Sequence, residues 1–515
     1  MDQTVNDRPA TVADTERPEL GKELKVVIFG AGPAGLTAAW ELVHNGVQVD
    51  VLEADPEKVG GIARTASYKG FRFDIGGHRF FTKAPEVRKL WHEILSENDW
   101  LKVPRLSRIY YRGKFFSYPL KPFDALRKLG LFQTALCMLS YLRIKVFPRR
   151  NEKSFEDWVV NRFGVRLYTI FFKTYTEKVW GIPCTEISAD WAAQRIKGLS
   201  LVNAIKNSFH RPSKRPGKAG KGEVIKTLIE EFEYPKLGPG MMWERAVEKI
   251  QGLGARVHMG SPVTSLRRSE AGLVEAEVSN GEGTRSFTGT HFLSSLPIRN
   301  LVSMLDPPAP AEVIEAAQAL SYRDFLTVVL VIDREKLFPD NWIYIHEPDV
   351  RLGRVQNFKN WSPHMVPDPS KTALGLEYFC TQGDDLWNMS DEELIKLGSE
   401  EIARLGLAQA DEIEDGTVVR MLKAYPVYDE HYETNVSVVR AFIEKEVPNL
   451  QLAGRNGMHK YNNQDHSMMT ALLSARNIMG ENWDPWKVNT DAEYHEEFEE
   501  GHDTAGRAVP RPVSS

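Results

Sequence analysis

Three glycines and one carboxylate near the start of the chain have the spacing of a dinucleotide-binding turn. Gly30, Gly32 and Gly35 match the pattern G-x-G-x-x-G, and Glu53 follows roughly 20 residues after Gly32. The first glycine permits a tight turn, the second lets a pyrophosphate approach the backbone, and the third lets a helix pack on the sheet. The carboxylate can accept hydrogen bonds from an adenosine ribose. The predicted binding residues here are Gly30, Gly32, Pro33, Ala34, Gly35 and Glu53.

The surrounding residues predict the elements that would hold this turn. Residues 25–29 form an apolar run typical of a buried strand, and residues 49–53 form a second run that ends in Glu53. Between them the chain reads as a helix that begins at the glycine turn. The free N–H groups and partial positive charge of its first turn would then face the phosphates. The sequence therefore predicts a βαβ-type unit over residues 24–83.

Two further glycine pairs indicate which dinucleotide is bound. Gly60-Gly61-Ile62-Ala63 follows the acidic strand, and Gly76-Gly77-His78 comes shortly after it. Such pairs let more backbone lie close to a large cofactor. In these residues the chain resembles the FAD family of amine oxidases, protoporphyrinogen oxidases and UDP-galactopyranose mutases. The resemblance implies FAD, rather than NAD, as the cofactor, and implies cofactor-binding roles for Gly60, Gly61, Ile62, Ala63, Gly77 and His78.

A longer block narrows the resemblance. Residues 173–181, Lys-Thr-Tyr-Thr-Glu-Lys-Val-Trp-Gly, are similar to a block of the UDP-galactopyranose mutases, in which the tyrosine and the tryptophan face the nucleotide sugar. Arg195 and Arg354 resemble the two arginines that bind the diphosphate in that family. Two guanidiniums could hold a pyrophosphate by paired hydrogen bonds. The substrate-binding residues implied are Tyr175, Trp180, Arg195, Arg354 and Tyr425, the last from a Tyr-Pro-Val segment.

Near the C-terminus, residues 452–467 resemble the mutase segment that holds the flavin. Gly454 and Arg455 match a Gly-Arg pair of the family, and Tyr461 lies where the family has a tyrosine. Asn463 stands where the mutases have an aspartate, so it keeps hydrogen bonding but loses the charge. The cofactor-binding residues implied are Val263, Gly454, Arg455, Asn463, Gln464, Asp465 and Ser467.

Composition excludes several classes of partner and site. The 515 residues are 42% hydrophobic and 26% charged with a net charge of −5, so no overall basic field would attract nucleic acid. The three cysteines lie far apart and the histidines show no metal-ligand pattern, so we expect no metal site and a reducing, cytoplasmic location. No signal peptide is apparent, and residues 1–23 and 489–515 read as polar tails.

The pattern along the chain predicts an α/β protein with three kinds of unit. These are a discontinuous Rossmann-like FAD-binding domain, a helical substrate or lid domain, and a substrate domain built on an antiparallel sheet, with strands expected at 325–332, 342–346 and 374–379. Residues 84–230 read as mostly helical. The expected boundaries are 24–115, 223–300 and 426–488 for the FAD-binding domain, 116–222 for the helical domain, and 301–425 for the antiparallel sheet.

One apolar stretch, residues 129–142, invites a membrane interpretation because basic residues flank it on both sides. It is too short to cross a bilayer but could lie on a membrane surface. The favoured interpretation is a core helix with solvated basic ends, which makes membrane-surface contact the less favoured alternative.

The resemblance implies an enzyme that interconverts pyranose and furanose forms of a nucleotide sugar at a reduced flavin, without net redox change. The alternative is an oxidoreductase of the protoporphyrinogen-oxidase or amine-oxidase type, which Asn463 favours. A third class is a flavin-binding protein with a docking role. A nucleotide sugar or another small molecule is the expected substrate, and NAD(P)H or a second flavin is a candidate reductant. The catalytic residues implied are His78, Tyr175, Trp180, Arg195, Arg354, Tyr425 and Tyr461.

Overall fold

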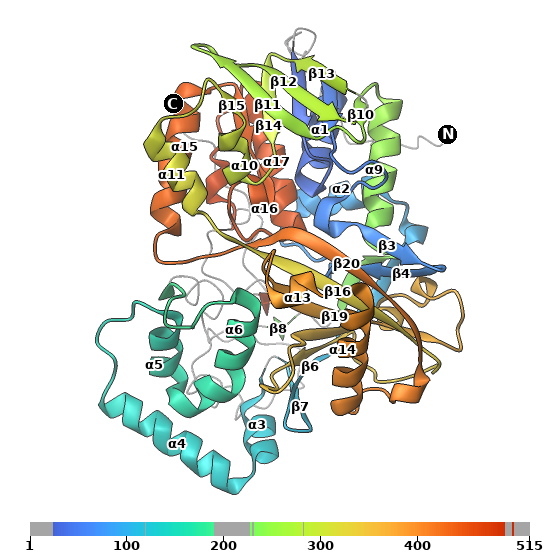
Figure 1. Cartoon of the computed structure of the whole chain (residues 1–515), viewed down its shortest axis with the longest axis vertical. Helices are drawn as coiled ribbons and strands as arrows, with labels where there is room; N and C mark the ends of the chain where they lie inside the picture. The colour runs from blue at the N-terminus through green and yellow to red at the C-terminus, as the bar shows by residue number, and fades with distance from the viewer. Residues whose placement is uncertain are drawn as a thin grey trace, which may run out of the picture.

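The computed structural model describes residues 24–189 and 231–489, apart from 119 and 282, together with two short strands, β8 (Thr227–Leu228) and β22 (Glu497–Phe498). Figure 1 shows three parts. A parallel sheet and its covering helices lie at the top, a seven-stranded sheet crosses the middle, and a group of helices lies at the lower left. Arg195 lies outside the described residues.

The parallel sheet is assembled from segments that lie far apart in the sequence. Its five strands stand in the order β10-β2-β1-β14-β21, and every neighbouring pair is parallel. Their bounds are Arg256–His258 (β10), Gln48–Leu52 (β2), Lys25–Phe29 (β1), His291–Ser294 (β14) and Leu450–Leu452 (β21). The predicted α/β class with a discontinuous Rossmann-like part is thereby confirmed.

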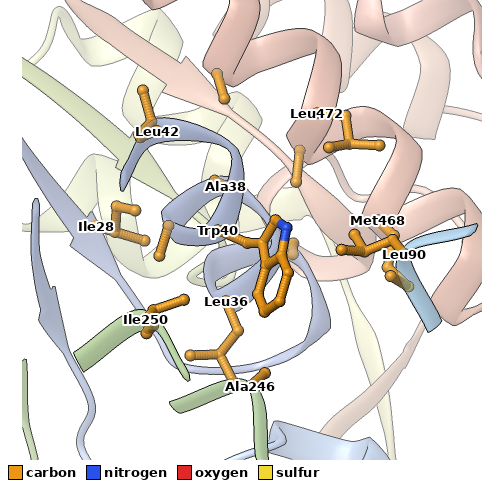
Figure 2. Close-up of a cluster of buried hydrophobic side chains, with 14 of the residues drawn as sticks. Ile28, Leu36, Ala38, Trp40, Leu42, Leu90, Ala246, Ile250, Met468 and Leu472 are labelled. Atoms are coloured by element: carbon orange, nitrogen blue, oxygen red, sulfur yellow. The ribbon is translucent and has the colours of Figure 1, made fainter. Parts of the chain in front are cut away.

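Helix α1 (Pro33–His44) is the central helix of this part because other helices surround it. It packs on α17 (Gln464–Ile478) and α9 (Gly240–Gly252), with α2 (Pro85–Ile94) close by. Figure 2 shows Trp40 of α1 among Leu36, Leu90, Ala246 and Met468, which come from all four helices. Burial of this many apolar side chains fixes the start of α1 against the ends of the strands.

The opposite face of the parallel sheet is covered by a second apolar cluster. A four-stranded sheet lies here in the order β13-β12-β11-β15, and three helices complete the layer. The elements are β11 (Val263–Ser269), β12 (Gly272–Asn280), β13 (Gly283–Thr288), β15 (Leu305–Asp306), α10 (Ile298–Ser303), α11 (Ala311–Ala319) and α15 (Tyr432–Glu446).

The sheet in the middle of the molecule has the order β20-β16-β19-β18-β17-β6-β7. All its pairs are antiparallel except β17 with β6. Helix α14 (Asp391–Arg404) packs on one face. The strands predicted at 325–332, 342–346 and 374–379 are confirmed as β16 (Tyr322–Ile332), β17 (Trp342–Ile345) and β19 (Thr372–Cys380), which stand with β18 (Arg354–Asn357) and β20 (Ile413–Pro426).

Four strands lie where the sequence predicts mostly helix, the short β8 among them. β5 (Trp100–Pro104) pairs with β9 (Glu231–Pro235), while β6 (Ser107–Tyr111) and β7 (Lys114–Ser117) form a hairpin at the edge of the middle sheet. Arg112 and Gly113 both have positive φ, which makes the tight turn of this hairpin. Residues 107–111, which the sequence predicts as part of a mostly helical stretch, therefore belong to the sheet that carries Arg354.

The helical part contains α3 (Pro122–Leu129), α4 (Leu131–Val146), α5 (Phe155–Tyr168) and α6 (Thr174–Trp180). Gly130, with φ +84°, separates α3 from α4. Only Cys137 and Tyr141 of α4 are buried, so the interpretation of residues 129–142 as a core helix is wrong. No helix among the described residues combines the length and the apolar character needed to cross a bilayer.

An ion pair attaches the edge strand β10 to the parallel sheet. Asp50 on β2 is 2% exposed and accepts hydrogen bonds from Arg256 (2.7 Å from both Nε and Nη2) and from His258 (2.8 Å) on β10. Burial raises the pKa of Asp50, but the hydrogen bonds from His258 and Arg256 outweigh burial and bring the pKa to about 2. This carboxylate therefore stabilises the folded chain above its ordinary pKa of 3.8, and the contribution is lost as pH falls through about 2.

Replacing Asp50 with Asn should lower the free energy of unfolding by about 2 kcal/mol at neutral pH, because Asn cannot accept three charge-assisted hydrogen bonds. The difference from the unaltered protein should shrink as pH falls from about 4 towards 2, since both proteins then carry a neutral group there. Urea unfolding followed by circular dichroism would measure it. Asp349→Asn, at an exposed carboxylate, is the matched control. A difference that stays constant down to pH 2 would contradict the assigned ion pair.

Candidate active site

The glycine turn between β1 and α1 has the conformation that the sequence predicts. Gly30 has φ +95°, and its N–H donates to the carbonyl of Leu52 (2.8 Å). A Cβ at Gly30 would lie 2.5 Å from Oγ of Ser295, and a Cβ at Gly35 would collide with the carbonyl oxygen of Gly30. Gly32 is the N-cap of α1 and provides no side-chain cap, and no acidic residue follows in the first turn. The N–H groups at the start of α1 are therefore available to an anion.

The acidic residue of the motif is held by two backbone groups. Oε2 of Glu53 accepts a hydrogen bond from the N–H of Ala31 (2.7 Å), and Oε1 accepts one from the N–H of Asp55 (2.9 Å). Burial raises the pKa of Glu53, although both hydrogen bonds act to lower it. Each oxygen keeps a second lone pair, so the side chain is oriented to accept hydrogen bonds from a ribose.

A second loop crosses the glycine turn. The N–H of Gly60 donates to the carbonyl of Ala31 (2.8 Å), and Gly60 and Gly61 both have positive φ. A Cβ built on Gly32 would lie 3.9 Å from Cα of Gly61, so the two glycines face each other without an intervening side chain. Ala63 closes this loop and is 1% exposed. The loop and the turn therefore bring Gly32, Gly60 and Gly61 together beside the start of α1.

A cavity of about 250 Å³ lies next to this loop, which contributes Ile62 to its lining. It lies where the middle sheet meets the segments that follow β4 (Phe71–Asp74) and β21. Ten residues predicted from the sequence line it: Ile62, Gly77, His78, Arg354, Tyr425, Arg455, Tyr461, Asn463, Gln464 and Asp465.

Gly454 joins the cavity to the glycine turn. It has φ +81°, and a Cβ there would lie 2.9 Å from Cβ of Ala34. Arg455, the next residue, donates to the carbonyls of Asn462 (2.9 Å) and Ala424 (3.0 Å), and its guanidinium lies 5.4 Å and 5.0 Å from the ring centres of Tyr425 and Tyr461. These two tyrosine rings stack at 5.6 Å with an angle of 17°. Arg455 and the tyrosine pair thus form one wall.

Arg354 forms a second wall, and its charge is paired. Its Nε and Nη2 both contact Oε2 of Glu377 at 2.6 Å, and Glu377 also accepts from Nε2 of Gln356 (2.8 Å). Glu377 is fully buried, so the pair is shielded from water. This leaves Nη1 of Arg354 as the donor for a ligand and holds the guanidinium in one orientation.

His78 is neutral at physiological pH. Burial lowers its pKa to about 3, and the positive charges of Arg455 and Arg354 act in the same direction. Its Nδ1 lies 3.2 Å from the carbonyl of Gly76, and a neutral ring in this position donates from Nδ1. Nε2 is therefore a hydrogen-bond acceptor. His459 packs against the ring of Tyr322 and does not line the cavity.

Tyr175 and Trp180 do not line the cavity, which departs from the prediction that both face the substrate. Tyr175 stacks on His346 (5.1 Å, 4°) and meets Tyr344 edge-on (5.4 Å, 88°). Trp180 is 3% exposed and lies 6.1 Å from the ring of Tyr461. Both side chains contact residues of the cavity wall, Tyr344 and Tyr461, from the short helix α6, which lies against β19 of the middle sheet.

Two predicted cofactor residues have different surroundings. Val263 begins β11 and packs in the apolar cluster below the parallel sheet, not in the cavity. Ser467 is buried on α17, where its N–H donates to the carbonyl of Asn463 (2.9 Å).

Gln464 at the start of α17 is 9% exposed, and neither atom of its amide has a partner among the described residues. A buried amide of this kind needs a ligand that can both donate and accept.

Several cavity residues were missed by the sequence analysis: Arg79, Phe81, Tyr118, Trp342, Tyr344, Gln356, Trp361, Tyr428, Lys460 and Asn489. Alternation on β17 could have indicated Trp342 and Tyr344, which lie two residues apart on one strand. Arg79 directly follows the recognised Gly-Gly-His segment. Tyr118 and Tyr428 stand in connections, for which the sequence offers no such signal.

The arrangement fits an extended dinucleotide with a flat, hydrogen-bonding end group. The uncapped start of α1 suits a pyrophosphate, Glu53 suits a ribose, and the amide of Gln464, which has no partner among the described residues, lines the cavity. A flavin ring carries donors and acceptors on one edge, which such an amide can satisfy.

Comparison with known proteins agrees with this assignment. Residues 33–479 match the model of the flavin-containing amine oxidoreductases. The chain is 23% identical to the coproporphyrinogen III oxidase of Mycobacterium leprae (strain TN) over 453 residues, 83% of this chain and 92% of that protein. It is 25% identical to a 15-cis-phytoene desaturase of Capsicum annuum over 455 residues, 83% and 72% of the two chains.

Among solved structures, reduced UDP-galactopyranose mutase has the same fold, with a TM-score of 0.77, 21% identity and coverage of 91% of this chain and 100% of that one. The match over 33–479 spans most of the chain, which therefore belongs to the flavin-containing amine oxidoreductase family. It is an FAD-dependent enzyme of that family.

Replacing Gly32 with Val should abolish FAD binding while the chain still folds. Among the described residues, a Cβ at Gly32 meets nothing closer than 3.9 Å, and its backbone conformation is open to any residue, so the added bulk would conflict with the pyrophosphate. Flavin absorbance per protein would measure occupancy, and circular dichroism would measure folding. Gly252→Val, in open space on α9, is the control. Full flavin content in the Gly32 variant would show that this turn does not hold the cofactor.

Proposed function

We propose that the protein is a flavin-dependent mutase that interconverts the pyranose and furanose forms of a nucleotide sugar. The observation that carries the proposal is the lining of the cavity, where, among the described residues, four basic side chains and one acidic one stand among rings of tyrosine and tryptophan. The basic residues are Arg79, Arg354, Arg455 and Lys460, and the acidic one is Asp465. A diphosphate suits the guanidiniums, while base and sugar faces suit the rings.

The protein's own groups would bind and orient the substrate in this proposal. Nη1 of Arg354 would donate to a phosphate oxygen, with Glu377 holding the guanidinium in place. Burial raises the pKa of Tyr425, so its phenol stays protonated and can donate a hydrogen bond. Nε2 of His78 would accept a hydrogen bond from a sugar hydroxyl. Bound FAD in its reduced form supplies a nucleophilic nitrogen for chemistry at the anomeric carbon.

The second candidate is net oxidation of a small molecule by FAD. The names of the two sequence relatives, an oxidase and a desaturase, favour it. Asn463, which caps α17 at the cavity, also favours it because it stands where the mutases carry an aspartate. The likeness to UDP-galactopyranose mutase at 21% identity concerns the fold, so the choice between the two reactions depends on the chemistry of the cavity.

The contribution of Arg354 can be tested without leaving a buried charge behind. Changing Arg354 alone would strand the fully buried Glu377, which costs several kcal/mol, so the variant is Arg354→Ala with Glu377→Gln. We expect affinity for a nucleoside diphosphate sugar to fall roughly 30- to 1000-fold, since a charge-assisted phosphate contact contributes about 2–4 kcal/mol. Isothermal titration with UDP-galactose and a panel of related sugars would measure it.

Two controls accompany that double variant. Glu377→Gln alone keeps the guanidinium, and Arg351→Ala removes an exposed arginine that pairs with Asp385. Arg351→Ala should bind the sugars with nearly unchanged affinity, and Glu377→Gln should bind them more tightly than the double variant because it keeps the guanidinium; both should carry normal FAD. If the double variant binds as tightly as these controls, Arg354 has no part in phosphate binding.

The two reactions differ in the redox state in which the enzyme works. A mutase should be inactive in air, gain activity after reduction with dithionite, and consume no reductant or oxygen per turnover, because only reduced flavin is nucleophilic. NMR of the sugar anomeric signals would follow the ring isomers. An oxidase should show the opposite behaviour, in which the substrate bleaches oxidised flavin and oxygen or another acceptor restores the colour. Anaerobic bleaching with one oxidised product per flavin would overturn the mutase proposal.

A further inference from the structure

Exposed apolar side chains gather at one end of the molecule. Ten large apolar side chains of the described residues are markedly exposed, and six of them lie between residues 131 and 147. The most exposed are Leu131 (93%), Phe132 (75%) and Phe147 (73%). Single exposed apolar residues are normal on a protein surface, but a group of this size on one element marks an interaction site.

The six belong to α4 and the residue after it, and most follow helical spacing. Leu131, Leu139, Leu142 and Val146 recur every three or four residues, so they share one face of the helix, with the exposed Ala135 between them. Figure 1 shows α4 as the outermost helix at the lower edge of the molecule. We call this face, defined by Leu131, Phe132, Leu139, Leu142, Val146 and Phe147, the outer face of α4.

The inner face of α4 holds the helix firmly to the rest of the protein. Cys137 and Tyr141 are buried in an apolar cluster with Leu167 and Phe171. A Cβ at Gly164 on α5 would lie 2.9 Å from the backbone nitrogen of Tyr141, so the two helices touch through their backbones. The outer face is therefore presented by a packed helix and not by a loose segment.

Positive charge surrounds the outer face. Residues 121–150 contain seven lysines and arginines and a single acidic residue, Asp124, in a chain whose net charge is −5. Arg127 is exposed before the start of α4, and Arg143, Lys145 and Arg150 are exposed at its end. An apolar face bracketed by cations at both ends is complementary to acyl chains below anionic headgroups.

We propose that the protein docks on an anionic lipid bilayer through the outer face of α4. The apolar side chains would enter the boundary between headgroups and acyl chains, with the helix lying in the plane of the surface, and the flanking cations would contact the headgroups. A second copy of the chain is a poorer occupant, because apposing two such faces would bring two strongly basic segments together. The docking is independent of the reaction catalysed in the cavity.

Vesicle cosedimentation with the full FAD-bound protein tests the proposal. We expect binding to phosphatidylcholine vesicles that contain about 30% phosphatidylglycerol, weak binding to pure phosphatidylcholine, and loss of binding between about 0.05 and 0.5 M NaCl. Absence of binding to the anionic vesicles at low salt would overturn the proposal.

Two double variants separate the apolar from the electrostatic contribution. Phe132→Gln with Leu139→Gln should lower vesicle binding at least tenfold, and Arg143→Gln with Arg150→Gln should lower it roughly tenfold while weakening its dependence on salt. All four side chains are exposed, so FAD content and thermal unfolding should not change. The control is Leu253→Gln with Leu422→Gln, which removes two exposed apolar residues elsewhere (53% and 45% exposed) and should bind as before.

Sedimentation velocity in the absence of lipid tests whether a second copy of the chain, rather than a bilayer, covers the outer face of α4. A dimer that the Phe132 and Leu139 changes dissociate, together with no binding to vesicles, would assign the face to a second copy and contradict the proposal. Equal vesicle binding by the α4 variants and the Leu253 control would also contradict it. The salt dependence of the unaltered protein stands as a test even if a variant fails to fold.

Discussion

Close contact between backbone segments at the start of α1 is the constraint on which the rest of the structure depends. The turn at Gly30 and the loop at Gly60 and Gly61 contact each other through backbone atoms, and the turn at Gly454 lies against the methyl group of Ala34 on α1. These segments come from opposite ends of the chain, so the turn reaches its final form only when the N-terminal and C-terminal strands share one sheet. The discontinuous domain thus brings three glycine turns from distant parts of the sequence to the start of one helix.

The same contact positions the substrate side of the cavity. Arg455 follows Gly454 directly and donates to the carbonyl of Ala424, and Asn456 donates to the carbonyl of Lys423 (3.0 Å). Both acceptors lie at the end of β20, one or two residues before Tyr425. The turn that contacts α1 therefore also fixes the end of the middle sheet. Arg354 stands on β18 of that sheet, two strands beyond β16. The hydrogen bonds from Arg455 and Asn456 therefore fix the position of the middle sheet relative to the parallel sheet.

The sequence predicted those parts that depend on local rules. The glycine turn and Glu53 obey spacing that follows from backbone geometry, and β16 and β19 are apolar runs long enough to be read as buried strands. The hairpin β6–β7 was missed because its alternation is short and interrupted by Arg112 and Gly113. The resemblance to the mutases predicted that Tyr175 and Trp180 contact the substrate. Neither residue lines the cavity, because their positions depend on how α6 packs, which no local pattern encodes.

The apolar run of α4 is a second case in which the sequence alone could not predict the packing. A stretch of leucine, phenylalanine and cysteine is compatible with a core helix and with a surface helix, since composition does not state which face has a partner. Only the packing shows that Cys137 and Tyr141 face inward while the leucines face outward.

The electrostatics of the cavity narrow the choice among the reactions of the family. Glu377 neutralises one of the four basic groups, and His78 contributes no charge because its pKa is about 3. In the part of the lining that the structure describes, three basic side chains then face a single carboxylate, so this part remains positive even after pairing. A cationic amine would be repelled there, whereas a substrate with phosphate or carboxylate groups would be attracted. The fold is shared with enzymes for many substrates, and in this chain the charge of the cavity favours the anionic ones.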